Sequence, residues 1–326
     1  MSDASIDNVA DAAIDDDEIP LEVVSDVEYT WEDTLRDILY AYVVIPGKIL
    51  LNDYRALVGF GIVLLYLATA TLGTWLLEPT SMWAGERLTQ PFQTMAHPLG
   101  TDPQGRDLLK LIVYGTPPVL TMMFSGGLFV VVVGTIVGTL AGFAGGRIDS
   151  VLSTATDVAL TIPGLPLIIV LAVTLNPKNP ILIGILLGIN GWGGLARNLR
   201  SQVLSIREEE YVEAARAMGV TTRSVLSKDI LPNMMPYVMY NFMSSMRGVL
   251  FASVGLYYLG VLPYSQENWG VLIDQAYTNG ALTTWSMFHW IVWPILAVVT
   301  LSLGLILISQ STDKLFNPRV RARHED

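Results

Sequence analysis

Cysteine and histidine, which often take part in catalysis and metal binding, are absent and scarce, respectively, in this sequence. It contains no cysteine, and its three histidines, His97, His289 and His324, are far apart along the chain. Thiolate metal sites and cysteine nucleophiles are therefore excluded, and no clustered imidazole site is expected. The Gly-x-x-x-x-Gly-Lys-Ser/Thr pattern that cradles phosphates is also missing. We therefore expect no cofactor and no metal site in this chain.

One polar segment, residues 205–219, carries charged and small residues at helical spacing. Ser205 and Glu208 form a capping-box pattern at its start, and Gly219 suits the left-handed position that closes a helix. The spacing predicts a short helix with one small apolar face. This face consists of Tyr211, Ala214, Ala215 and Met218. It is too shallow to enter a bilayer deeply, so the residues leave two alternatives equally open: contact with a groove of another protein and packing on the chain's own spans.

Two ionisable residues, Asp157 and Arg247, lie inside long apolar runs. Such residues usually face a bundle interior or water rather than lipid. Asp157 is about four to six residues from the end of its run, so we expect its carboxylate to reach the interface. Arg247 is about ten residues deep, which favours lining a path or pairing with a neighbouring subunit. A direct pair between the two residues remains open.

Membrane-spanning helices must position these residues. Of the 326 residues, 52% are hydrophobic and only 15% are charged, and the mean hydropathy is +0.47. Apolar runs recur that are long enough to cross about 30 Å of hydrocarbon as helices. The six predicted spans cover residues 56–77, 118–144, 151–175, 181–196, 237–261 and 287–308. The predicted fold is therefore an all-α, polytopic membrane protein with six transmembrane helices.

Two of the predicted spans contain residues that shape helices. The second span has small residues at helical spacing, among them Gly134, Gly138 and Gly142, which predict close packing inside a bundle. The third span is interrupted by Pro163 and Pro166, which predict a kink.

Charge is distributed unevenly along the chain. Residues 1–37 contain 13 of the 30 acidic residues and one of the 19 basic residues, with few large apolar side chains, so we expect a disordered, solvated tail. With the N-terminus in the cytoplasm, 14 basic residues lie inside, one lies in a span and four lie outside. The positive-inside rule thus predicts a cell-membrane protein with both termini and segment 197–236 in the cytoplasm.

Several motifs resemble the permease subunits of binding-protein-dependent ABC importers. The letters EAA at 213–215, Gly219 and ILPN at 230–233 are similar to the "EAA" loop of that family. HPLGTDPQGRD at 97–107 resembles a segment of the C-type permease in the dipeptide and oligopeptide subfamily, and NWG at 268–270 and NPR at 317–319 match further positions. The likeness covers about residues 40–320, beyond the acidic tail.

The resemblance implies a type I ABC importer permease whose EAA loop forms a cytoplasmic coupling helix docked on an ATPase. It also implies a transport subunit that is not an enzyme, with ATP hydrolysis in the partner subunits. The residues implied in this contact are Glu210, Tyr211, Glu213, Ala214, Ala215, Arg216 and Gly219. The implied partners are a second homologous permease, cytoplasmic ATP-binding subunits, an extracellular solute-binding protein and the lipid bilayer, with no nucleic acid. Asp157 and Arg247 stay candidate path-lining residues.

The resemblance also suggests how the chain is organised. An acidic cytoplasmic tail, 1–37, is followed by a region with the first span and an external loop, 38–117. The transmembrane domain covers 118–312 and contains the coupling loop 197–236. A cytoplasmic tail, 313–326, ends the chain. Ser253 and Gln310-Ser311 depart from residues common in relatives, so the solute stays open between peptides and an oligosaccharide or nickel complex. A secondary transporter or channel and an intramembrane enzyme are further alternatives, but neither ion-coupling charges nor paired membrane carboxylates are evident.

Overall fold

The computed structural model describes residues 53–209, 218, 220, 224, 230–262 and 268–315. All of these residues belong to the second of the two contact units of the chain, Met1–Ile45 and Pro46–Asp326. The described part is built from helices, and its β structure is limited to one isolated bridge between Thr101 and Asp107. The predicted all-α fold is therefore confirmed.

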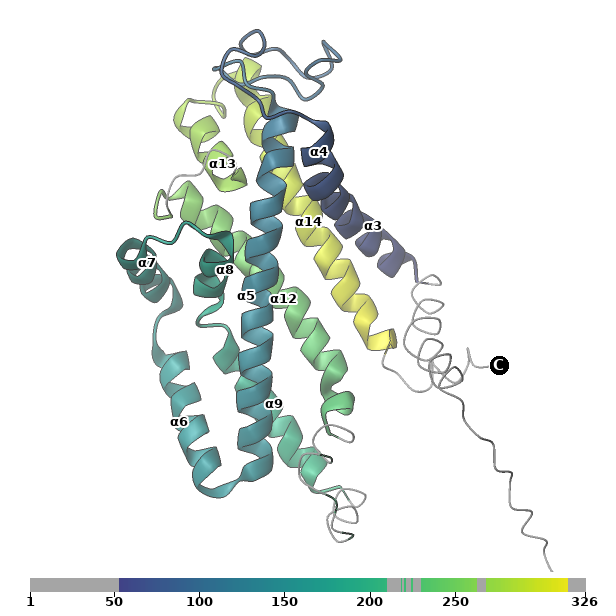
Figure 1. The fold of residues 1–326 in the computed structure, drawn as a ribbon, viewed down its shortest axis with the longest axis vertical. Helices are drawn as coiled ribbons and strands as arrows, with labels where there is room; N and C mark the ends of the chain where they lie inside the picture. Colours follow the sequence, from purple (N-terminus) through teal and green to yellow (C-terminus); the bar gives the residue numbers. More distant parts are fainter. Residues whose placement is uncertain are drawn as a thin grey trace, which may run out of the picture. The chain divides into compact units, whose positions relative to one another are not determined.

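The elements follow one another along the chain as shown in Figure 1. They are α3 (Tyr54–Ala68), the π-helix η2 (Thr69–Gly73), α4 (Thr74–Leu76), α5 (Leu108–Ala144), α6 (Gly146–Thr161), α7 (Gly164–Leu175), α8 (Pro180–Gly188), α9 (Trp192–Arg207), α12 (Leu231–Tyr258), α13 (Trp269–Thr278), the 3-10 helix η4 (Trp285–Met287) and α14 (Phe288–Leu315).

Three helical stretches of the described chain are long and apolar enough to cross a membrane: Tyr54–Leu76, Leu108–Ala144 and Trp285–Thr312. The predicted third and fourth spans are not single straight helices. They are the bent pairs α6 with α7, at 84°, and α8 with α9, at 55°, which bring the number of candidate spans to five if each pair counts as one. The first bend lies at Ile162 and Pro163, where both residues are extended, because a proline disfavours helical geometry in the residue before it.

The predicted fifth span corresponds to α12, which has 28 residues. It is long enough to cross a bilayer but is not among the candidate spans by apolar character. Its sequence explains this difference, because Asn241, Ser244 and Arg247 lower its hydropathy.

The helix α5 lies at the centre of the bundle and packs against α8, α9 and α12 (Figure 1). Its glycines allow α9 to approach its backbone. A Cβ atom on Gly138 would lie 2.5 Å from the Ala196 carbonyl oxygen, and one on Gly142 would lie 2.8 Å from the Arg200 carbonyl oxygen. The close packing expected from the glycine spacing is thus confirmed.

The first candidate span packs against the last. A Cβ atom on Gly59 of α3 would lie 2.9 Å from the Gly304 carbonyl oxygen of α14. Further along the same contact, the Tyr66 hydroxyl donates a hydrogen bond to the Ala297 carbonyl oxygen at 2.9 Å. Helix α14 also packs on α12 and α13, so it joins the first span to the rest of the bundle.

Candidate functional site

The residues predicted to contact an ATPase lie outside the described part of the chain. They are Glu210, Tyr211, Glu213, Ala214, Ala215, Arg216 and Gly219. The structure does describe the helix that leads to them. Helix α9 ends at Arg207, Glu208 follows as its C-terminal cap, and Glu209 is the last described residue before this segment.

The predicted helix start at Ser205 is wrong, because Ser205 lies within the last turn of α9 and Glu208 follows the end of that helix. Tertiary packing explains the extension. The buried face of α9 continues through Leu199 and Val203, and Ile206 packs against the same apolar cluster. Burial of this face stabilises the helix beyond the point at which the capping pattern predicts a break.

Two ion pairs connect the middle of α9 to α6. The Arg200 guanidinium donates to both carboxylate oxygens of Asp149, from Nε to Oδ1 at 2.5 Å and from Nη2 to Oδ2 at 2.7 Å. The Ser153 hydroxyl donates to Asp149 Oδ1 at 2.9 Å and helps to orient the carboxylate. The two-pronged geometry sets the direction as well as the distance of this contact.

The second pair joins Arg197 Nη2 to Asp157 Oδ1 at 2.5 Å. Their side chains are 58% and 63% exposed, respectively. Asp157 therefore pairs with Arg197 rather than with Arg247, and the direct pair that the sequence left open is not formed. The expectation that its carboxylate reaches the membrane interface stays a prediction.

A cavity of about 230 Å³ lies between α5, α6 and α9. Its walls are formed by Val137, Gly138, Ala141, Ser153, Thr156, Asp157, Ala196, Arg197 and Arg200. The two arginines and Asp157 thus line the same space that separates α6 from the α5–α9 contact.

Arg247 lies on α12 beside a small cavity of about 20 Å³. The cavity is lined from α12 by Tyr240, Met243, Ser244 and Arg247 and from α14 by Leu305, Ile306 and Ser309. The guanidinium of Arg247 forms no ion pair with the described residues. Its neighbours on α14 belong to the second half of the candidate span Trp285–Thr312.

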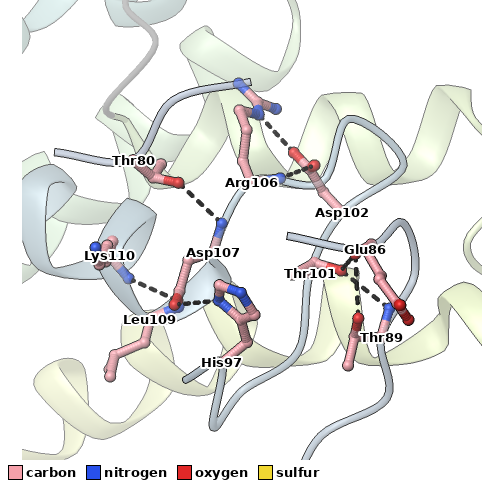
Figure 2. A network of polar contacts seen from close by, with 10 residues as sticks. All are labelled: Thr80, Glu86, Thr89, His97, Thr101, Asp102, Arg106, Asp107, Leu109 and Lys110. Atoms are coloured by element: carbon pink, nitrogen blue, oxygen red, sulfur yellow. Dashed lines mark hydrogen bonds and ion pairs between the residues drawn. The ribbon is translucent and has the colours of Figure 1, made fainter. Parts of the chain in front are cut away.

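At the other end of α5, the segment 78–107, here called the cap segment, folds around a buried ion pair (Figure 2). The Asp102 Oδ1 atom accepts hydrogen bonds from the backbone N–H groups of Gln104 and Arg106, both at 2.9 Å. Its Oδ2 atom accepts from Arg106 Nε at 2.5 Å, and Arg106 Nη2 donates to Gln275 Oε1 of α13 at 2.9 Å. The pair therefore ties the cap segment to α13.

A second acid of the cap segment starts α5. Asp107 Oδ1 accepts from the backbone N–H groups of Leu109 and Lys110 at 2.8 and 3.2 Å, which is N-terminal capping. Its Oδ2 atom lies 2.8 Å from His97 Nδ1, as Figure 2 shows. The carboxylate thus caps the N-terminus of α5 and also contacts His97 in the preceding loop.

The cap segment also reaches α14. His289 Nε2 lies 3.1 Å from the Thr101 carbonyl oxygen. Gly100 has a φ of 84°, and a Cβ atom there would lie 3.0 Å from the His289 ring, so only glycine fits this turn. Three helices, α5, α13 and α14, are thereby held together at one end.

Sequence reasoning used HPLGTDPQGRD at 97–107 only as a mark of resemblance and missed this network. Two signals were available. Asp102 and Arg106 are spaced four residues apart, and Asp107 directly precedes an apolar run, as an N-cap residue does. The contacts with Gln275 and His289 left no comparable signal, because they join residues far apart in the sequence.

Together, the long apolar helices and the glycine-packed core define a multi-pass integral membrane protein. Residues 134–322 match the family model described as the binding-protein-dependent transport system inner membrane component, and the chain belongs to this family. It is accordingly a membrane transport component rather than an enzyme, as predicted.

Relatives with similar sequences include permeases from two bacteria. The dipeptide transport system permease protein of Bacillus subtilis is 32% identical over 239 residues, which cover 72% of each chain. The oligopeptide transport system permease protein of Haemophilus influenzae is 32% identical over 58% of this chain and 61% of its own length. A structure of an inward-facing MetNI methionine ABC transporter aligns with a TM-score of 0.44 and 19% identity, over 62% of this chain and 96% of that chain.

Proposed function

We propose that this chain is one permease subunit of an ATP-driven importer and forms half of a transmembrane path for peptides. The observation that carries the proposal is the family match over residues 134–322, together with relatives named as dipeptide and oligopeptide permeases. ATP hydrolysis is assigned to partner subunits. The task of this chain is to convert their motion into helix movement around the path.

In this proposal, motion enters the chain at segment 210–219 and continues through α9. The contact residues are Glu210, Tyr211, Glu213, Ala214, Ala215, Arg216 and Gly219. Support comes from α9, which leads directly into this segment and whose buried face is pressed against the glycines of α5. A helix in such close backbone contact moves with its neighbour rather than sliding past it, because carbonyl oxygens of α9 fill the space over the α5 glycines.

The proposed partners are a second homologous permease, cytoplasmic ATP-binding subunits and an extracellular solute-binding protein. The distribution of basic residues supports cytoplasmic termini and a cytoplasmic segment 197–236. The cap segment, which lies at the opposite end of α5, then faces outward. The 37 residues of α5 extend over about 55 Å, enough to connect the two sides of the membrane.

Arg247 and Asp157 are retained as candidate path-lining residues. Support for Arg247 is its place on a cavity between α12 and α14, without an ion-pair partner among the described residues. An ionisable group in a membrane span is expected to meet water, another subunit or a solute. Asp157 has the weaker claim, because Arg197 already neutralises it.

Co-purification with the ATP-binding subunits tests the coupling contact. The variants Glu213→Ala and Gly219→Leu are expected to weaken association, whereas Lys178→Ala, an exposed residue of the turn between α7 and α8, serves as the control. Association that is absent in the unmodified chain, or equal in all variants, would contradict the proposal.

Uptake into proteoliposomes tests the solute. The complete complex, with its solute-binding protein, is expected to accumulate a labelled dipeptide in an ATP-dependent way. Competition by unlabelled peptides, but not by an oligosaccharide or a nickel complex, would support the peptide assignment. If the oligosaccharide or the nickel complex competes instead, the importer assignment would stand but the transported solute would not be a peptide.

A further inference from the structure

Helix α6 is attached to the bundle in an unusual way. Of its 16 residues, Thr156 is the one that is buried. The equally long α9 buries five, Gly193, Leu195, Ala196, Leu199 and Val203. Helix α6 thus buries fewer side chains than α9, although its Leu160 packs closely on α9, where a Cβ atom on Gly193 would lie 3.0 Å from Leu160 Cγ.

The space beside α6 explains this smaller burial. The cavity of about 230 Å³ lies between α6 and the α5–α9 contact, so the side chains of α6 do not interdigitate with both neighbours there. Atoms that line a void lack dispersion contacts on one side. Beside this cavity, polar contacts add to the packing of Leu160 on α9.

The two ion pairs bridge this space. Both acids, Asp149 and Asp157, belong to α6, and both arginines, Arg200 and Arg197, belong to α9. The acids are eight residues apart, which is about two helical turns, so they lie near the same face. The earlier acid pairs with the later arginine and the later acid with the earlier arginine, as antiparallel helices require.

The two contacts differ in strength. Asp149 receives two hydrogen bonds from Arg200 and one from Ser153, and the Asp149 and Arg200 side chains are 20% and 35% exposed. Asp157 and Arg197 are more than half exposed and make one contact. The first pair thus fixes the distance and direction between the helices, while the second restrains rotation about that point.

We propose that these two ion pairs form a strut that transmits displacement of α9 to α6 and, across the 84° bend, to α7. The inference rests on the proposed function, since α9 receives its motion from segment 210–219. Asp149, Arg200, Asp157 and Arg197 are positioning residues, which act through the helices that they join. The strut thus gives motion a second route from segment 210–219 into the bundle, in addition to the direct packing of α9 on α5.

Transport measurements on the complete complex in proteoliposomes test the strut. Asp149→Asn and Arg200→Gln are expected to lower the peptide taken up per ATP hydrolysed by about 2- to 30-fold, the range typical of residues that modulate coupling between sites. ATP hydrolysis stimulated by the solute-binding protein is expected to persist. The exchange variant Asp149→Arg with Arg200→Asp is expected to restore much of the uptake, since it rebuilds the pair.

The matched control is Arg147→Gln, an exposed residue of the same helix that forms no ion pair with the described residues. Its uptake per ATP is expected to equal that of the unmodified chain. An equal ratio in Asp149→Asn, Arg200→Gln and the control would overturn the proposal. So would a parallel loss of hydrolysis and uptake that the exchange variant fails to restore, because that pattern indicates a structural role alone.

A distance measurement tests the strut independently of the solute. The chain has no cysteine, so spin labels can be placed at Ser150→Cys on α6 and Gln202→Cys on α9 without further changes. With the pairs intact, the distance between the labels is expected to stay constant between ATP-bound and nucleotide-free complexes, and to broaden in Arg200→Gln. If the distance between the labels changes with nucleotide while both ion pairs are intact, the strut proposal is overturned. Failure of peptide uptake alone would count against the proposed function instead.

Discussion

The two ends of α5 carry the same type of side-chain pair in opposite surroundings. In the cap segment, Arg106 and Asp102 are 8% and 0% exposed. Between α6 and α9, Arg197 and Asp157 are 58% and 63% exposed. Burial makes the loss of one partner costly for the first pair, whereas an exposed pair contributes less, so we expect the same chemistry to fasten one end of the bundle more strongly than the other.

The surroundings of the pairs extend this contrast. The cap segment is hydrogen-bonded to α13 through Gln275 and to α14 through His289. The other end contains the cavity of about 230 Å³ between α5, α6 and α9. A filled, cross-linked end resists deformation, whereas an incompletely packed end leaves room for movement. We therefore expect α6 and α9, held to each other by their ion pairs, to move together and to be displaced more than the cap segment.

The largest effect is expected for Arg106→Ala. This variant leaves the carboxylate of Asp102 buried without its cation, which typically costs about 3–5 kcal/mol. The measurement is the midpoint of thermal unfolding of the detergent-purified protein. The control is Arg87→Ala, which removes a guanidinium that stacks on Trp83 in the same segment, 4.2 Å from the ring centroid. Equal stability of both variants would contradict the fastening role of the cap segment.

An intermediate effect is expected for Gly138→Ala. The new methyl group would meet the Ala196 carbonyl oxygen at 2.5 Å, so α9 must move away from α5, at a cost of about 1–3 kcal/mol. The same unfolding assay applies. Gly248→Ala is the matched control, because a Cβ atom on this α12 glycine meets nothing within 4 Å. A loss of stability in the control but not in Gly138→Ala would refute the close α5–α9 contact.

The smallest effect on stability is expected for Asp157→Asn. Exposed ion pairs contribute about 0.2–1 kcal/mol, so the unfolding midpoint should change little. The loss should also shrink at high salt, because mobile ions screen the pair. A large, salt-independent destabilisation would show that this pair resembles the one in the cap segment, and the contrast between the two ends would then disappear.

Much of the fold was predictable from the sequence because its signals are local. Long uncharged runs predicted helices, since in hydrocarbon a helix satisfies its own backbone hydrogen bonds. The kink at Pro163 and the close packing at Gly138 were predicted for the same reason, because the effects of a proline ring and of a missing side chain are local to the residue that causes them. The residues predicted to contact an ATPase lie outside the described chain and stay a prediction.

Other features could not be predicted in this way. The capping pattern at Ser205 is a local signal, but burial of Val203 and its neighbours extended α9 through it. The depth of Arg247 along its own helix did not indicate which part of α14 it would face. In both cases the outcome depended on a neighbouring helix, and the spacing of residues along one segment contains no information about that neighbour.

By itself, the amino-acid sequence determined that this chain is a helical membrane protein of the importer permease family, because hydrophobic length and motif spacing are properties of contiguous residues. Only the tertiary structure decided that Asp157 pairs with Arg197, that His97 meets Asp107, and that Arg106 reaches Gln275. Such pairs require side chains to come within hydrogen-bond distance, and that proximity arises from helix packing for the first and third pairs and from the fold of the cap segment for the second.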